Sequence, residues 1–199
     1  MNCPLGRATA HELQLPVRME PNLKGKRIAI LATDGVEQVE LEKPRKALDD
    51  AGAVTVLVAP KQPEIQAFRH HEAGDRLKVD AKLTEVTPDE FDGLMLPGGA
   101  LNPDQLRTIP DAVEFVRGFS QRGKPIAAIC HAPWILVEAD IVRGRRVTSW
   151  PSLKTDLRNA GARWLDEEVV VDGRLVTSRK PDDIPAFSRE MVAVFAKRS

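Results

Sequence analysis

Short apolar runs alternate along this chain with longer amphipathic stretches, and this alternation limits what the chain can fold into. The runs are too short for helices and are apolar on both faces, which is typical of buried parallel strands; they comprise residues 28–32, 54–58, 93–97 and 125–130. Helical spacing is expected between and after them, at 37–51, 111–123, 133–139, 152–161 and 185–197. We therefore predict an α/β fold in which helices cover both faces of a mostly parallel sheet.

The segments outside this alternation carry signals of their own. Asp172-Gly173 lies between two apolar runs and predicts a hairpin over 168–178, while 146–150 is expected to be extended. Pro44 should kink the first helix or delay its start. Residues 60–78 are polar and irregular, so we expect a long loop there, and such loops often border functional sites.

The size and composition of the chain favour one soluble globular domain. It has 199 residues, and Lys+Arg and Asp+Glu both number 29, so no basic face for nucleic acid is indicated. Residues 1–25 lack periodicity and are expected to be an N-terminal extension to a domain at 26–199. No apolar stretch reaches the roughly 20 residues of a membrane-spanning helix, and no secretory signal is evident, which predicts a cytoplasmic protein.

The strongest chemical motif is Ala128-Ile-Cys-His-Ala-Pro133. A buried strand ends at Cys130, and Pro133 can occupy the first turn of the following helix, so the sulfur lies on a sharp strand-to-helix turn. Free amides at the start of that helix favour a thiolate, and His131 can carry a proton. The motif therefore predicts a nucleophile of depressed pKa. The other cysteine, Cys3, lies in the extension, so a structural disulfide that would block the Cys130 thiol is improbable.

Two further segments follow strands whose carboxyl ends should lie at the same edge of the sheet. Gly98-Gly99 can present amides to a ligand and form an oxyanion hole, although a plain glycine turn explains the pair as well. Residues 36–41, which include Glu37 and Glu40, follow the first strand and can place a carboxyl group beside the sulfur. Taken alone, they also suit an ordinary helix start with acids in its first turn.

In combination these motifs resemble the PfpI (ThiJ/PfpI) family of intracellular cysteine-peptidase-like proteins, within the superfamily of the Parkinson-linked deglycase. The resemblance rests on four segments and covers about residues 26–198: Phe91-Asp-Gly-Leu-Met-Leu-Pro-Gly-Gly99, Gly123-Lys-Pro-Ile-Ala-Ala-Ile-Cys-His131, Asn159-Ala-Gly-Ala162 and Val176-Thr-Ser-Arg-Lys-Pro-Asp-Asp183. It implies a flavodoxin-like three-layer sandwich of the class I glutamine amidotransferase-like kind.

The same resemblance implies roles for individual residues. Cys130 would be the nucleophile, His131 its neighbour, and Glu37 a buried acid that hydrogen-bonds the sulfur. Asp104 matches an acidic residue that is donated across a subunit interface to orient the histidine, which implies a homodimer or a higher homo-oligomer. His131-Ala132 departs from the common His-Gly, and the added methyl group could narrow access to the site.

The function expected from these residues is hydrolysis by a cysteine enzyme in a stress response. The resemblance implies a small-molecule or peptide substrate, with peptide hydrolysis, deglycation and glyoxalase chemistry as alternatives, all begun by attack of sulfur on a carbonyl group. The alternative from another class is a redox sensor or holdase chaperone that uses an oxidisable Cys130 without turnover.

Other sites and activities are disfavoured by the sequence. No histidine follows the Cys130 turn, which excludes a glutamine amidotransferase, and two cysteines with scattered histidines do not make a zinc site, so no metal or cofactor is expected. His70-His71 is expected to be a solvated pair in the long loop. Trp134 and Trp150 are expected to be packing residues.

Overall fold

A seven-stranded sheet forms the centre of the molecule, for which a computed structural model describes residues 22–197. Its order is β11-β12-β8-β7-β1-β3-β6, and every neighbouring pair is parallel except β11 and β12. These strands are β1 (Arg27–Leu31), β3 (Val54–Ala59), β6 (Ala81–Lys82), β7 (Gly93–Leu96), β8 (Ile126–Ile129), β11 (Val169–Asp172) and β12 (Leu175–Ser178). The predicted parallel sheet is confirmed, as is the hairpin around Asp172-Gly173.

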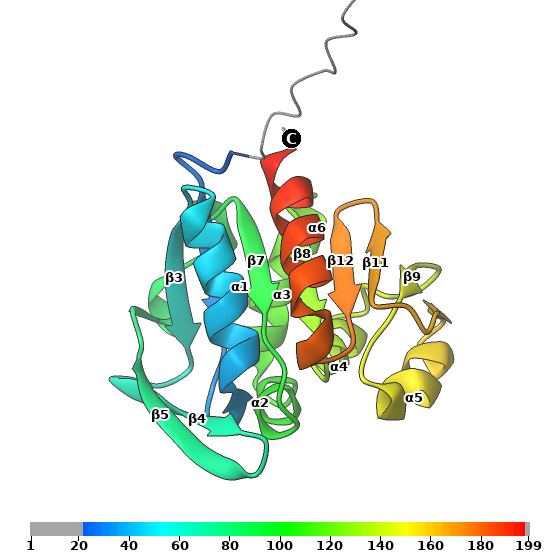
Figure 1. Ribbon diagram of the computed structural model, residues 1–199, viewed down its shortest axis with the longest axis horizontal. Helices are drawn as coiled ribbons and strands as arrows, with labels where there is room; N and C mark the ends of the chain where they lie inside the picture. The colour runs from blue at the N-terminus through cyan, green and yellow to red at the C-terminus, as the bar shows by residue number, and fades with distance from the viewer. Residues whose placement is uncertain (1–21, 198–199) are drawn as a thin grey trace, which may run out of the picture.

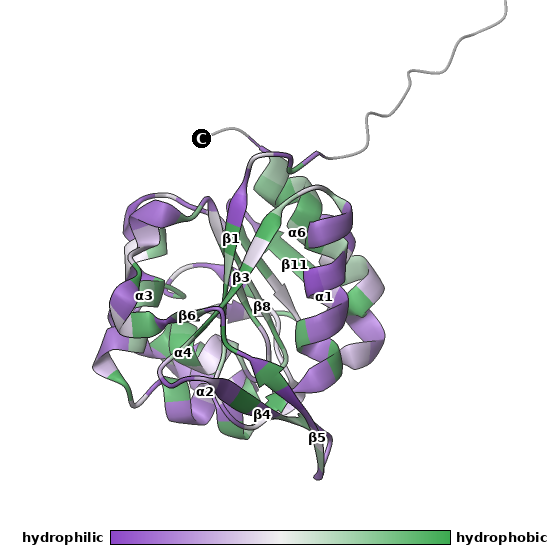
Figure 2. Ribbon diagram, turned by 90° about the vertical axis from the view of Figure 1, so that its left-hand side faces the viewer, coloured by the Kyte–Doolittle hydropathy of each residue, from purple (hydrophilic) through white to green (hydrophobic). Residues whose placement is uncertain are grey.

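Helices cover both faces of this sheet, as Figures 1 and 2 show. One layer contains α1 (Gln38–Asp50) and α6 (Ile184–Ala196). The opposite layer contains α2 (Leu101–Leu106), α3 (Pro110–Gln121), α4 (Pro133–Glu138) and α5 (Lys154–Asn159). Short 3₁₀ turns occupy Leu83–Glu85, Pro88–Glu90, Pro151–Leu153 and Pro181–Asp183.

Each layer buries its own apolar core against the sheet. The α3 side packs Phe91, Phe115 and Phe119 together, and the α1 and α6 side buries Phe187 and Phe195. The strands alternate their side chains between these two cores, which explains why their sequences are apolar throughout. The three-layer α/β sandwich predicted from the sequence is thus confirmed.

Pro44 lies inside α1, which begins at Gln38 and runs without interruption to Asp50. Proline lacks the amide that would bond the carbonyl four residues earlier, so it removes one helical hydrogen bond at Glu40. The predicted delay of the helix start is therefore wrong. Burial of Pro44, together with Leu41 and Leu48, keeps the segment helical.

The predicted loop at 60–78 is wrong, because the segment forms a hairpin of β4 (Glu64–Arg69) and β5 (Glu72–Lys78). Ile65 and Ala67 are buried on one face of β4, whereas β5 is mostly exposed, so charged residues hid the period-two pattern. The short strand β2 (Val36–Glu37) pairs in parallel with β4 and joins the hairpin to the segment after β1.

For the remaining segments, the sequence-based predictions are confirmed only in part. The stretch at 146–150 is regular only over β9 (Arg146–Val147), which pairs with β10 (Arg163–Trp164). Most of the proposed N-terminal extension, Cys3 included, lies outside the described residues. Within 22–197, no helix combines the length and apolar character that crossing a membrane requires.

Candidate active site

Cys130 occupies a sharp turn between β8 and α4. Its φ is +64°, a left-handed conformation that residues other than glycine rarely adopt. Two backbone hydrogen bonds hold it there: the Cys130 amide donates to the Ser178 carbonyl over 3.0 Å, and the Trp150 amide donates to the Cys130 carbonyl over 2.9 Å. The residue is only 6% exposed. The strand-to-helix turn expected from the sequence is therefore present, and β12 and the Trp150 segment stabilise it.

The imidazole of His131 lies directly beside the sulfur. Cys130 Sγ is 3.1 Å from His131 Nδ1, within hydrogen-bonding range. The ring stacks on Trp150, with centroids 5.8 Å apart and an interplanar angle of 23°, and it also contacts Trp134. Burial lowers the pKa of His131, so the ring is neutral near pH 7 and can accept a proton. The two tryptophans thus line the catalytic pair rather than serving only as packing residues.

The acid beside the sulfur is Glu40, and the expectation that Glu37 hydrogen-bonds it is wrong. Glu40 is fully buried, interacts with Cys130, and accepts a hydrogen bond from the Gly98 amide at Oε2 over 3.1 Å. The reason is the start of α1 at Gln38. It leaves Glu37 in β2 and turns Glu40 toward the core, on the face shared by Pro44 and Leu48. That i, i+4, i+8 spacing is the sequence signal that identifies Glu40.

Glu40 is protonated at neutral pH. Burial, reinforced by the nearby charge of Glu37, raises the pKa of its carboxyl to about 8. Its second oxygen, Oε1, is buried without a hydrogen-bond partner among the described residues, which would be costly for an ionised carboxylate. A proton on Oε1 removes that cost and gives the carboxyl a donor to direct at the sulfur.

The thiol itself is not acidic in the unliganded chain. Burial raises the pKa of Cys130, an ionised Glu40 would raise it further, and the Gly99 and His131 amides oppose these effects only in part. These surroundings do not support the depressed pKa expected from the sequence, which stays a prediction. Protonation of Glu40 removes the negative charge that would repel a thiolate. The protonation state of this carboxyl therefore affects the pKa of the Cys130 thiol.

The glycine pair after β7 packs closely against this group. A Cβ atom on Gly98 would lie 2.4 Å from Glu40 Oε2 and 2.5 Å from Cys130 Cβ, so only glycine fits. The Gly98 amide is bonded to Glu40, and the Gly99 amide interacts with both Glu40 and the sulfur. Of the two donors predicted for an oxyanion hole, Gly99 is the one directed at the reacting atom.

Buried Asn102 holds the glycine turn in place, a role that sequence reasoning missed. Its Nδ2 donates to the carbonyls of Pro97 and Gly98 over 2.9 and 3.0 Å, and its Oδ1 accepts the Thr33 amide over 2.8 Å. A single amide therefore ties the end of β1 to the end of β7. The sequence signal is weak, because an asparagine after a glycine pair suits any turn.

These groups open into a cavity of about 530 Å³ at the carboxyl end of the sheet. The cavity is lined by Gly35, Glu37, Glu40, Phe68, His70, His71, Gly99, Ala100, Leu101, Cys130, His131, Trp150 and Pro181. Its volume suits a small molecule or the side chain of a peptide. His70 and His71 are exposed, as expected, and they also line the cavity that contains the sulfur.

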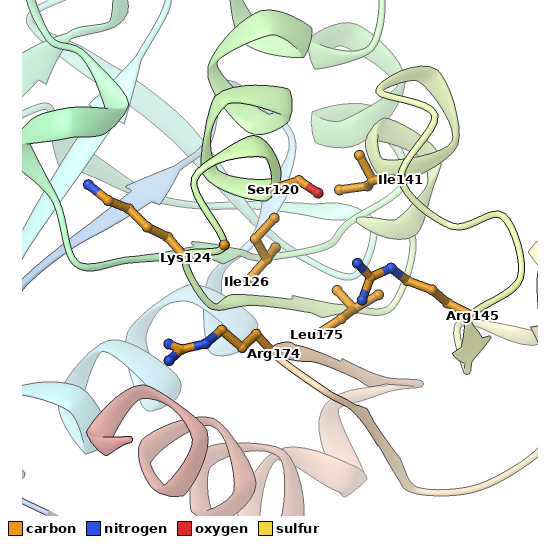
Figure 3. A pocket seen from close by; sticks show the side chains of 8 residues that line it. Ser120, Lys124, Ile126, Ile141, Arg145, Arg174 and Leu175 are labelled. Atoms are coloured by element: carbon orange, nitrogen blue, oxygen red, sulfur yellow. The ribbon is translucent and has the colours of Figure 1, made fainter. Parts of the chain in front are cut away.

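A second hollow lies at the opposite end of β8 and β12 and is shown in Figure 3. It measures about 50 Å³, and its lining contains no thiol, carboxylate or imidazole. Lys124, at its edge, is already bonded to the carbonyls of Pro88 and Phe91. Of these two hollows in the described part of the chain, the Cys130 cavity is the one that contains a nucleophilic side chain.

Comparison with known proteins agrees with this geometry. The sequence profile of the DJ-1/PfpI family matches residues 26–194. The chain belongs to the DJ-1/PfpI family. It is 46% identical over 166 residues to a deglycase of Pyrococcus abyssi, covering 83% of this chain and 97% of the relative. It is 44% identical to protein/nucleic acid deglycase 2 of Escherichia coli, covering 83% of this chain and 95% of the relative.

The fold of a solved DJ-1/PfpI structure also matches. The crystal structure of Drosophila melanogaster DJ-1beta superposes with a TM-score of 0.79 at 27% identity, covering 87% of this chain and 91% of that chain. The family resemblance and the class I glutamine amidotransferase-like fold expected from the sequence are thereby confirmed.

One expected site feature of a DJ-1/PfpI chain, the contact of Asp104 with His131, is not found within the single chain described. Asp104 is exposed on α2 and does not line the cavity, so its proposed contact with His131 stays a prediction about an assembly. Within residues 22–197, no cluster of three or more His, Cys, Asp or Glu side chains could hold a metal ion.

Proposed function

We propose that this protein is a cysteine hydrolase that cleaves the bond between a carbonyl-derived carbon and an amine nitrogen, as in deglycation. The observation that carries this proposal is the Cys130 sulfur, 3.1 Å from a neutral imidazole and backed by a protonated carboxyl, at the floor of a cavity of about 530 Å³. Two relatives at 44–46% identity are named as deglycases, which favours this chemistry.

The first step is displacement of the amine by sulfur at the adduct carbon, which carries a hydroxyl group and the nitrogen and adjoins the carbonyl carbon. His131 Nδ1 takes the thiol proton, the S–C bond forms and the C–N bond breaks, and the imidazolium passes its proton to the departing nitrogen, which leaves as the free amine. The Gly99 and His131 amides interact with the sulfur in the unliganded site, so they are the nearest donors for the oxyanion that develops in the second step. Proton transfer during attack avoids a free thiolate, whose formation burial disfavours.

The second step converts the resulting hemithioacetal into a thioester. His131 takes the proton of the carbon bonded to sulfur and returns it to the neighbouring carbonyl carbon, by way of an enediolate. Water then attacks the thioester, and His131 takes a proton from that water. Glu40 keeps its proton throughout, because a charge beside the sulfur would raise the pKa of the leaving thiol.

Asp104 belongs to this proposal as a contribution from a second subunit. Its side chain is exposed on α2, where another copy of the chain can be reached. An acid at the far side of the imidazole would stabilise the imidazolium formed in both steps. The site would then be completed by homo-oligomerisation.

The proposal is tested by amine release from methylglyoxal adducts of N-acetylated amino acids. Wild-type protein should release the free amine, and Cys130→Ser should lower kcat/KM at least about a thousandfold. Cys3→Ser is the matched control and should keep full activity. Free methylglyoxal must be followed in parallel, because its consumption without amine release would indicate glyoxalase chemistry instead. Stoichiometric oxidation of Cys130 without turnover would favour a redox sensor and contradict the proposal.

A further inference from the structure

Glu37 is a buried acid that the catalytic group does not use. Only 8% of the residue is exposed, although it lies at the edge of the Cys130 cavity. Its Oε2 accepts a hydrogen bond from the backbone amide of His70 over 2.9 Å. A buried carboxylate that bonds a backbone amide 33 residues away is a fixed structural link rather than a chance surface contact.

The amide that Glu37 binds belongs to a strained turn. His70 connects β4 to β5 with a φ of +58°, in the left-handed region that disfavours side chains other than glycine. Such a conformation persists only when surrounding contacts hold it. The hydrogen bond that the His70 amide donates to Glu37, at the point where β2 pairs with β4, is one such contact.

Gln38, the next residue, holds the opposite strand of the hairpin. Its Oε1 accepts the Asp75 amide over 3.0 Å and the Arg69 guanidinium over 3.2 Å, and its Nε2 donates to the Asp75 carboxylate over 2.7 Å. Gly74 makes room for this amide, since a Cβ there would lie 2.4 Å from Gln38 Oε1. Two consecutive residues therefore fasten the hairpin on both strands.

The fastened hairpin carries one wall of the cavity. Phe68, His70 and His71 line it from the hairpin, while Leu101 and Trp150 line it from the rest of the domain. Leu101 is 53% exposed and Trp150 is 38% exposed, so apolar surface is available to a bound group. The cavity thus offers an aromatic ring and two imidazoles from the hairpin and apolar side chains from the rest of the domain.

We propose that Glu37 is a positioning residue that fixes the β4–β5 turn over Cys130, so that this turn selects substrates by the group attached to the reacting carbonyl. The selected group is bulky and has an apolar surface that Phe68, Leu101 and Trp150 can contact. The substrate class rests on the proposed function, whereas the positioning of the turn is an independent property of the fold.

Two variants of Glu37 separate its hydrogen bond from its charge, and two variants of β5 test the hairpin. Glu37→Ala removes both, whereas Glu37→Gln removes the charge but retains an oxygen that can accept the His70 amide. Both substitutions remove the charge that contributes to the raised pKa of Glu40, so a difference between them reports on the hydrogen bond. Gly74→Ala disturbs the hairpin away from the cavity, and Glu72→Ala, exposed on β5, is the matched control.

The first measurement compares phenylglyoxal and methylglyoxal adducts of the same N-acetylated amino acid. For the phenyl adduct, Glu37→Ala and Gly74→Ala should raise KM at least about tenfold with a smaller change in kcat, because substrate contacts rather than the reacting atoms are displaced. The methyl adduct should be much less affected. Glu37→Gln should restore most of the affinity lost in Glu37→Ala, and Glu72→Ala should behave as wild type.

The second measurement does not require turnover. Alkylation rates of Cys130 by iodoacetamide and by N-benzyliodoacetamide give a ratio of bulky to small reagent for each variant, and amide hydrogen exchange reports on His70. Glu37→Ala should change that ratio and speed exchange at His70, whereas Glu37→Gln should do neither to the same extent. An unchanged ratio and unchanged exchange in Glu37→Ala would overturn the inference. If Glu37→Ala shows both changes but the wild-type protein does not turn over the adducts, only the proposed function is refuted.

Discussion

At Cys130, side chains from three separate elements meet around one sulfur atom. Glu40 comes from α1, His131 follows β8, and Trp150 stacks on the imidazole from the segment after β9. Sequence reasoning identified the sulfur and the histidine because a strand–Cys–His–helix pattern is local. It selected the wrong glutamate because Glu37 and Glu40 both follow the first strand, and only the register of α1 distinguishes them.

Glu40→Gln should change how stability depends on pH. Burial raises the pKa of Glu40 to about 8 in the folded protein, against an ordinary value of 4.5. The unfolded chain therefore binds fewer protons at this site between these two values, and the wild-type free energy of unfolding should fall as pH rises through this range. Glu40→Gln should lack this loss. Urea unfolding of both proteins from pH 5 to 9 measures the difference, and parallel curves would contradict a protonated Glu40.

Trp150→Ala should move the acid limb of the pH–activity profile upward. Burial lowers the pKa of His131, and loss of the stacked indole exposes the ring, so its pKa should rise toward the ordinary value. The neutral base would then be lost at a higher pH as the solution is acidified. A profile of kcat/KM against pH measures the shift. Trp150→Phe retains an aromatic face and should keep the limb near its wild-type position.

At the scale of elements, the end of β7 and the start of α1 are built as one unit. Gly98 donates its amide to Glu40, and Asn102 holds the Gly98 carbonyl, so the two elements cannot move independently. The predicted strands and helices were largely confirmed, because apolar runs and helical spacing are local signals. The β4–β5 hairpin escaped prediction because its exposed strand is charged and its turn has no Asn-Gly or Asp-Gly pair.

Gly98→Ala should damage the site more than a glycine substitution elsewhere. The added methyl group would overlap Glu40 and Cys130, and overpacking of this kind costs about 1–3 kcal/mol. Gly123→Ala is the control, because nothing lies within 4 Å of its Cβ position and only its positive φ of 63° is strained. Alkylation of Cys130 and amine release should change in Gly98→Ala alone. Equal effects of the two substitutions would refute the close packing.

At the scale of the whole molecule, the cavity lies at the carboxyl end of the sheet, where α/β folds bind their ligands. This position could be predicted from the sequence, because every candidate motif followed a strand. The contents of the cavity wall could not be predicted, since Phe68 and His70 reach it through a hairpin fastened by contacts between residues 31 to 37 positions apart. Contacts of that separation leave no periodic signal.

The proposed contribution of Asp104 from a second subunit is tested by mixing inactive chains. Cys130→Ser and Asp104→Ala should each be impaired alone, the latter mainly in kcat. After unfolding and refolding together, random pairing should restore about a quarter of wild-type activity, because half of the dimers would be mixed and each of these has one complete site. Separate sedimentation should show an oligomer. Full activity of Asp104→Ala as a monomer would remove this role.

The left-handed backbone at Cys130 also affects how this position should evolve. Any L-amino acid at this turn bears a conformational penalty of about 1–2 kcal/mol that glycine avoids, so retaining a thiol here works against the thermodynamic preference of the position. A copy released from selection for sulfur chemistry should drift toward glycine or asparagine there while keeping its architecture. The residue found at this turn is therefore a marker by which active members of a lineage could be separated from inactive ones.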